Sequence, residues 1–192
     1  MRTDDLYSLP ANLPVPEDDG ACAHLPGTVI PPLSLPATTG VLVRLDQSST
    51  PWTVVYAYPR TGEPGKDSPS GWDDIPGARG CTPQNCAFRD HYAELRSLGA
   101  SVFGLSTQET AYQQEMSARL HLPFPVLSDA GLVLTRALRL PTFEYGGATL
   151  LKRFTLVIQA GRIVHVIYPV FPSNTDAPAV LSWLRRSRPA PL

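Results

Sequence analysis

Two patterns of apolar residues alternate along the chain. The nearly continuous apolar run at 52–58 is typical of a strand buried on both faces, and residues 101–106 are expected to form a second buried strand. Other segments carry apolar residues every three or four positions, as amphipathic helices do. Extended segments are expected at 41–45, 52–58, 101–106, 125–128, 152–158 and 162–168. Helices are expected at 82–98, 109–120, 132–138 and 176–186.

This order of elements predicts an α/β fold. Alternating strands and helices build a parallel-rich sheet with helices on both faces. The turn at Ala160–Gly161 joins the last two strands into a hairpin, which adds an antiparallel edge and makes the sheet mixed.

The 192 residues suit one domain with an extension. Residues 1–36 contain seven prolines, which exclude a regular helix, and their apolar residues indicate an arm packed along the body. Residues 37–187 are expected to form the domain. Within it, 60–80 is rich in glycine and proline and reads as a long inserted loop, which is usually functional. Residues 188–192 are expected to be a frayed tail.

Charge and hydropathy narrow the functional classes. Lys and Arg total 16 and Asp and Glu total 17, so the net charge of −1 gives no indication of nucleic acid or an anionic membrane as a partner. No apolar run approaches the roughly 20 residues needed to span a bilayer. The polar start Met1–Asp5 does not resemble a secretory signal, so we expect a cytoplasmic protein.

The cysteines carry the candidate chemistry. Three cysteines make a poor disulfide framework, and a close pair in a reducing compartment is more often catalytic or metal-binding. Cys81 follows a glycine at the mouth of a helix, where exposed N–H groups favour negative charge and hence the reactive thiolate. Thr82 is expected to cap this helix, with Pro83 as its first residue.

Cys86 lies five residues further on. On one helix the two Cα atoms would be about 9 Å apart, whereas a disulfide needs less than about 7 Å. A bond between Cys81 and Cys86 would therefore require the first helical turns to unwind.

The segment from Gly80 to Asp90 resembles the active-site region of the peroxiredoxins. The pattern is Gly-Cys-Thr-x-x-x-Cys-x-hydrophobic-Arg-Asp, which is typical of the peroxiredoxin Q (bacterioferritin comigratory protein) type of the alkyl hydroperoxide reductase/thiol-specific antioxidant family. From about residue 30 onward, roughly three quarters of the chain is similar to that family. Supporting similarity lies at 95–107, 124–129, 153–158, 161–163 and 180–184.

The resemblance implies a thioredoxin-like fold and a peroxidase. Cys81 would be the peroxidatic cysteine, oxidised to a sulfenic acid by a hydroperoxide, and Cys86 the resolving cysteine of an intramolecular disulfide. Thioredoxin or a similar dithiol would reduce that disulfide. Arg153 would stabilise the thiolate and orient the peroxide. The resemblance implies no metal and no organic cofactor, and we expect a monomer, with a dimer as the alternative.

The chain departs from the family pattern before Cys81. The family's threonine and proline positions hold Ala78 and Asp74, and Pro59 takes the proline's place at the strand end, displaced by the 60–80 insertion. We expect Thr82 or a residue of the insertion to supply the missing hydroxyl. The alternative hypothesis is a thioredoxin-fold redox sensor or scaffold with weak peroxide turnover.

Other interpretations fit less well. A thioredoxin-type disulfide oxidoreductase would need a Cys-x-x-Cys motif, which is shorter than the spacing here. A zinc site built from Cys22, His24 and the cysteine pair matches no compact zinc spacing. Cys22 could be a further resolving thiol, a partner for another subunit or a packed residue, and we favour the packed residue.

Overall fold

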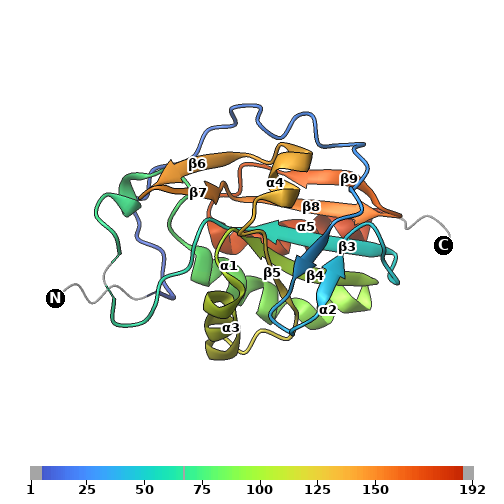
Figure 1. The fold of residues 1–192 in the computed structure, drawn as a ribbon, viewed down its shortest axis with the longest axis horizontal. Coiled ribbons are helices and arrows are strands. Elements are labelled where there is room, and N and C mark those ends of the chain that lie inside the picture. The colour runs from blue at the N-terminus through green and yellow to red at the C-terminus, as the bar shows by residue number, and fades with distance from the viewer. Residues whose placement is uncertain (1–5, 67, 188–192) are drawn as a thin grey trace.

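The structure is a computed structural model that describes residues 6–66 and 68–187 (Figure 1). The strands are β1 (Ser34–Pro36), β2 (Leu42–Arg44), β3 (Trp52–Ala57), β4 (Ala100–Ser106), β5 (Val126–Ser128), β6 (Thr142–Tyr145), β7 (Ala148–Leu151), β8 (Phe154–Gln159) and β9 (Arg162–Ile167). The α-helices are α1 (Cys81–Asp90), α2 (Tyr92–Ser97), α3 (Thr110–Arg119), α4 (Val133–Leu138) and α5 (Asp176–Arg186). Two short 3-10 helices are η1 (Trp72–Asp74) and η2 (Ser173–Thr175).

A five-stranded mixed sheet forms the centre of the molecule, in the order β5-β4-β3-β8-β9. Strands β3, β4 and β5 run parallel, whereas β8 and β9 are antiparallel to their neighbours. Helices cover both faces. The predicted α/β class with a mixed thioredoxin-like sheet is therefore confirmed.

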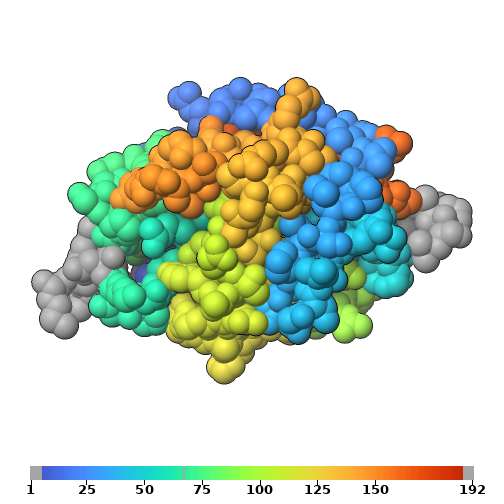
Figure 2. Space-filling view, viewed as in Figure 1, coloured from blue at the N-terminus to red at the C-terminus, as the bar shows by residue number. Residues whose placement is uncertain are grey.

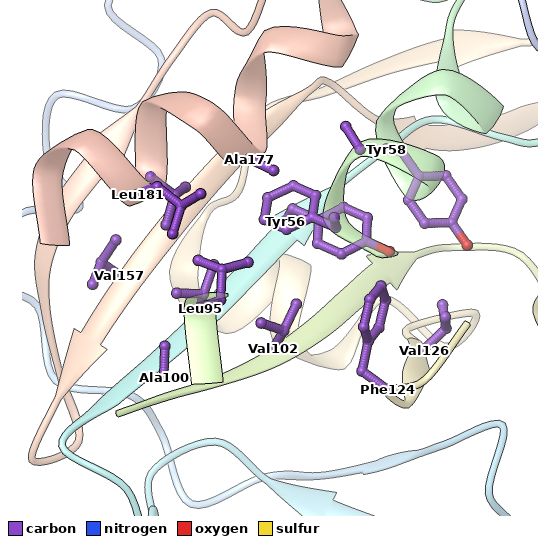
Figure 3. Packing of buried hydrophobic residues seen from close by; sticks show 14 of the residues in the cluster. Tyr56, Tyr58, Leu95, Ala100, Val102, Phe124, Val126, Val157, Ala177 and Leu181 are labelled. Atoms are coloured by element: carbon purple, nitrogen blue, oxygen red, sulfur yellow. The ribbon is translucent and has the colours of Figure 1, made fainter. Parts of the chain in front are cut away.

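The central strand β3 is buried along its whole length, as its apolar run predicts. Because side chains alternate between the two faces of a strand, Val54 and Tyr56 pack with α1, α2 and α5, whereas Val55 and Ala57 pack with α4 and the arm. Figure 3 shows the first of these layers, with Ala177 of α5 beside Tyr56 near the end of β3 and Leu181 of α5 near Leu95 and Val157. Cys81 belongs to this layer, so the packing of the core positions the cysteine relative to the sheet.

Three features differ from the sequence-based expectation. The single helix expected at 82–98 is interrupted at His91, which separates α1 from α2. Residues 34–36 of the proline-rich arm form β1, which pairs antiparallel with β2. The β6–β7 hairpin was not predicted.

The arm lies along the body of the protein from residue 6 to residue 36. Leu25, Ile30 and Leu35 are buried in the core layer next to α4. Asp19 fastens the arm by accepting hydrogen bonds from Lys152 and Tyr168. Figure 1 shows this segment, in blue, passing along the side formed by β9 and the β6–β7 hairpin. Residues 1–5 of the expected arm and the expected tail at 188–192 lie outside the described residues.

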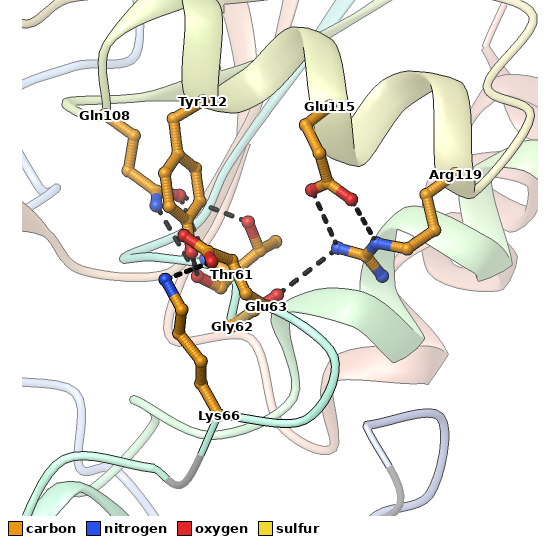
Figure 4. A network of polar contacts seen from close by, with 8 residues as sticks. All are labelled: Thr61, Gly62, Glu63, Lys66, Gln108, Tyr112, Glu115 and Arg119. Atoms are coloured by element: carbon orange, nitrogen blue, oxygen red, sulfur yellow. Dashed lines mark hydrogen bonds and ion pairs between the residues drawn. The ribbon is translucent and has the colours of Figure 1, made fainter.

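The 60–80 insertion packs against neighbours at its start and around Trp72. Figure 2 shows it in green beside the β6–β7 hairpin in orange, where Trp72 contacts the rings of Phe143 and Tyr145. At its start, α3 holds it: Tyr112 donates a hydrogen bond to the carbonyl of Thr61, and Arg119 donates one to that of Gly62 (Figure 4). The described residues of the insertion thus form a wall beside the start of α1.

Among the described residues, none of the helices combines the length and the apolar character that a membrane span requires.

Candidate active site

Helix α1 begins at Cys81, and Gly80 is its N-cap residue. Gly80 has φ 102°, and a Cβ atom there would lie 2.3 Å from Ser173 Oγ, so both the backbone conformation and the close approach require glycine. The prediction that Thr82 caps the helix was wrong: no side chain caps α1, and Thr82 lies inside its first turn. Pro83 is the third residue of the helix, not the first.

Cys81 combines burial with access to a pocket. Its side chain is 4% exposed, yet it lines a pocket of about 170 Å³ next to the insertion. Arg60, Trp72 and Tyr112 form part of the walls. The sulfur is therefore largely desolvated but is reached by a cavity that a small molecule can enter.

Arg153 lies beside the sulfur, one residue before β8. Its Nη2 atom is 3.3 Å from Cys81 Sγ and is also within 3.2 Å of the carbonyl oxygens of three consecutive residues, 77–79. Its Nη1 atom donates to Gln84 Oε1. Arg153 as a whole residue is only 3% exposed. A buried, permanently charged group with this many partners has little freedom to leave the thiol.

A second polar chain holds the first turn of α1 to the sheet. Asn85 Nδ2 donates to the carbonyl of Cys81 at 2.8 Å, and Tyr56 of β3 donates to Asn85 Oδ1 at 2.6 Å. All the side-chain atoms involved are buried. Sequence reasoning did not identify these residues, because their partners are set by the packing of α1 on β3.

Cys86 lies on the same helix in a different environment. Its side chain is half-buried and lines a separate depression with Tyr7, Leu9 and His91. Burial raises the pKa of the Cys86 thiol, and the nearby Arg89 opposes that shift. Both thiols are free, and they lie five positions apart on one helix, so about 9 Å lies between their Cα atoms.

Two threonines line the pocket with Cys81. One is Thr82, and the other is Thr61, in the insertion two residues after Pro59. Ala78 offers no hydroxyl, but its backbone carbonyl accepts hydrogen bonds from Arg153 and from the Cys81 thiol. The pocket therefore contains hydroxyls, although neither stands at the family's usual position.

Cys22 lies apart from this site. It is buried against the sheet face that α4 covers, and burial raises its pKa to about 12. His24 Nε2 is 2.9 Å from the carbonyl oxygen of Leu138. Within residues 6–66 and 68–187, no group of His, Cys, Asp and Glu side chains is arranged to hold a metal ion.

A cysteine at a helix N-terminus, facing a buried arginine on a thioredoxin-like sheet, defines a thiol-dependent redox protein. The family model described as Redoxin matches residues 25–181. The chain belongs to this family and, within it, is a peroxiredoxin of the peroxiredoxin Q type.

Relatives and solved structures agree with this assignment. The chloroplastic peroxiredoxin Q of Gentiana triflora is 32% identical over 85% of this chain and 70% of its own length. That of Oryza sativa subsp. japonica is 33% identical over 74% of this chain, which spans 58% of that relative's length. Peroxidoxin BcpB from Mycobacterium tuberculosis superimposes with a TM-score of 0.70 at 27% identity, covering 86% of this chain and 99% of that one. Peroxiredoxin Q from Xanthomonas campestris superimposes with a TM-score of 0.62 at 25% identity. The match covers 80% of this chain and 89% of that one.

Proposed function

We propose that this protein is a thiol peroxidase in which Cys81 reduces hydrogen peroxide or organic hydroperoxides. The Cys81 thiolate attacks the terminal peroxide oxygen, an S–O bond forms as the O–O bond breaks, and the departing alkoxide or hydroxide takes up a proton. The product at Cys81 is a sulfenic acid. The observation that carries the proposal is the 3.3 Å contact between Arg153 Nη2 and the Sγ atom of Cys81, a residue that lines an open pocket.

Arg153 is proposed to act in two ways. Its charge stabilises the thiolate, and its remaining donor capacity can orient the oxygens of a peroxide bound beside the Cys81 sulfur. Thr61 and Thr82 are the candidates for the hydroxyl that contacts the peroxide, because both line the same pocket. Hydroxyls serve this purpose because they both donate and accept hydrogen bonds.

Cys86 is proposed to resolve the sulfenic acid. Its thiol would attack the oxidised Cys81 sulfur, forming an intramolecular disulfide and releasing water. Because α1 keeps the two residues too far apart, its first turns would have to unwind first. Thioredoxin or a similar dithiol would then return both cysteines to thiols by disulfide exchange.

Rapid mixing with one equivalent of hydrogen peroxide, followed by intact mass spectrometry, tests these roles. Cys81→Ser should abolish rapid oxidation, whereas Cys86→Ser should keep it and accumulate sulfenic and sulfinic acid. Cys22→Ser is the matched control, since this thiol is buried outside the site, and it should behave as the wild type. Equal losses of the first oxidation in the Cys81 and Cys86 variants would contradict the assignment.

Ala78 favours one rival function, a redox sensor with weak turnover. A sensor would be oxidised at the rate of an ordinary thiol and would show no steady-state turnover with thioredoxin and its reductase. The peroxidase should be oxidised several orders of magnitude faster than free cysteine at the same pH.

A further inference from the structure

Asp176, the first residue of α5, is a buried carboxyl for which the reaction above has no use. Its side chain is 1% exposed. One oxygen, Oδ2, accepts hydrogen bonds from Gln84 Nε2 at 2.6 Å and from Thr155 Oγ1 at 2.8 Å. The other, Oδ1, is buried and has no hydrogen-bond partner among the described residues. A carboxyl that is only half satisfied in the core is costly and calls for an explanation.

Gln84 connects this carboxyl to the reactive sulfur. It is fully buried, and its amide has a donating and an accepting end. The NH2 group faces Asp176, and Oε1 accepts from Arg153 Nη1. The same guanidinium contacts Cys81 Sγ through Nη2. Three side-chain contacts therefore join Asp176 to the sulfur.

We propose that Asp176 is a positioning residue that, as a carboxylate, holds the Gln84 amide in the orientation that presents Oε1 to Arg153, and releases it on protonation. The proposal rests on the peroxidase function above. Asp176 touches neither the sulfur nor the pocket. It acts on the reaction through the geometry of the guanidinium.

The two protonation states differ in what Gln84 can do. A carboxylate only accepts hydrogen bonds, so the amide must turn its NH2 group toward Asp176. A protonated carboxyl carries a donor, which Gln84 Oε1 can accept if the amide turns. If the amide turns to meet it, its NH2 group faces the Arg153 guanidinium, and two sets of donors oppose each other. Arg153 then loses an acceptor and is no longer fixed against Cys81.

The surroundings place this change near neutral pH. Burial raises the Asp176 pKa to about 6, although the hydrogen bonds from Gln84 and Thr155 and the charge of Arg153 oppose the shift. From β3, Tyr56 also faces this carboxyl, and burial keeps the Tyr56 pKa well above its usual value, so that phenol stays neutral. The α1 and β8 side chains bonded to Asp176 are uncharged, as are all three residues of η2. Arg153 is thus the one cation among these groups.

The test is the pH dependence of Cys81 oxidation from pH 5 to 8. The rate with hydrogen peroxide is measured by stopped flow, and the thiolate fraction is measured separately by alkylation. The wild type should lose about tenfold between pH 7 and pH 5 beyond what the thiolate fraction explains, which is the size expected for a weakened charged hydrogen bond. Asp176→Asn accepts the same two hydrogen bonds and cannot be protonated, so this extra loss should disappear. Asp176→Leu should lose about tenfold at every pH.

A purely structural role for Asp176 predicts a different result. An acidic residue in the first turn of α5 would stabilise the helix N-terminus, and its replacement would lower thermal stability without changing the shape of the pH profile. Thr155→Val is the matched control, because it removes the other hydrogen bond to Asp176 and leaves Gln84 untouched. It should retain the extra loss below pH 7. The same extra loss in Asp176→Asn as in the wild type would overturn the proposal.

A spectroscopic readout separates this proposal from the peroxidase function. The side-chain amide signals of Gln84 in the reduced protein should titrate with a midpoint near 6 in the wild type and stay constant in Asp176→Asn. If the wild type reacts slowly with peroxide at every pH but Gln84 titrates, the peroxidase function fails and the positioning role stands. If Gln84 does not titrate, the positioning role fails whatever the peroxidase rate.

Discussion

The two ends of α1 carry the same residue type in opposite surroundings. At the first residue, Cys81 is buried against the Arg153 guanidinium, donates a hydrogen bond to the Ala78 carbonyl of the insertion and accepts one at its own carbonyl from Asn85. Five residues later, Cys86 is half-exposed on the edge of a depression. The two thiols are the same residue type and differ in their position relative to a fixed charge. This difference is the basis for proposing Cys81 as the peroxidatic and Cys86 as the resolving cysteine.

The division also involves rigidity. The Cys81 end is held by polar contacts that cross from helix to sheet, whereas the Cys86 end is followed by the break at His91. If the helix must unwind for the two sulfurs to meet, its contacts must keep α1 folded in the reduced protein. They must also be few enough to break when Cys81 is oxidised.

The largest effect is expected for Arg153→Met. Removing the guanidinium gives Cys81 surroundings like those of Cys86, so the rate of Cys81 oxidation should fall about 10²–10³-fold, as when a preorganised donor is deleted from an active site. Stopped-flow kinetics measure the rate. Arg153→Lys keeps the positive charge but loses the planar, forked set of donors. Its oxidation rate should therefore lie between those of the wild type and Arg153→Met.

Lys152→Met is the matched control for this change. It removes the neighbouring cation, which is paired with Asp19 on the surface, and should change the oxidation rate by less than about threefold. An Arg153→Met protein that folds and still reacts at the wild-type rate would remove the arginine from the mechanism.

The next effect is on the fold around Cys81. Gly80→Ala adds a Cβ at φ 102° that would collide with Ser173 Oγ, so we expect a loss of about 2–4 kcal/mol in the free energy of unfolding. Chemical denaturation measures it. Gly65→Ala is the control, because its φ is also positive but its surroundings are open, and it should cost about 1–2 kcal/mol. Similar losses in the two variants would mean that the close approach to Ser173 is not restrictive.

The sequence predicted the class of fold because its strongest signals are local. The apolar run of β3, the helical spacing of α3 and the bounds of α5, which agree with the expected 176–186, all depend on neighbouring residues. The β6–β7 hairpin had a signal in Gly146–Gly147, a turn dipeptide between two short extended segments. Strand β1 was hidden by Pro36 within it and by the prolines just before it; an edge strand tolerates such a proline.

The site was predictable only in part, because sequence patterns are local and some of its contacts join residues that are distant in the chain. The motif around Cys81 is contiguous, and Arg153 was found through the family resemblance. Gln84 and Asp176 are 92 residues apart in sequence, and nothing in either segment indicates that they meet. The capping prediction for Thr82 failed because the N-cap is Gly80, so the helix begins two residues earlier than a Thr82 cap would require. The contacts that distinguish the two ends of α1 are tertiary.

Asp176 should make stability depend on pH in an unusual direction. Its pKa is raised from 3.8 to about 6 by burial, so the folded protein binds more protons than the unfolded chain between those values. Stability should therefore fall as the pH rises through that window and be flat above it. Relative to Asp176→Asn, the loss in the wild type should be on the order of 2–3 kcal/mol. Chemical denaturation at pH 4, 5, 6 and 7 measures it.

Asp19 supplies a control of opposite sign. Hydrogen bonds from Lys152 and Tyr168 lower the Asp19 pKa, so its contribution is present above pH 4 and is lost as the pH falls further. The wild type should therefore lose stability as the pH falls below about 4, and Asp19→Asn should not show this part of the loss. If the wild type and Asp176→Asn keep a constant difference from pH 4 to 7, the carboxyl is not held protonated by burial.

The smallest effect concerns the contact that keeps the first turn of α1 closed. Asn85→Ala removes the hydrogen bond to the Cys81 carbonyl and leaves the Tyr56 hydroxyl buried without its partner, which should cost about 1–2 kcal/mol. Because the Cys81 end then resembles the looser Cys86 end, the oxidised protein should form its disulfide a few-fold faster. Quenched alkylation with mass spectrometry follows that step. Gln114→Ala, which removes an exposed amide on α3, should leave its rate unchanged. A lower stability with unchanged disulfide formation would show that this turn does not limit unwinding.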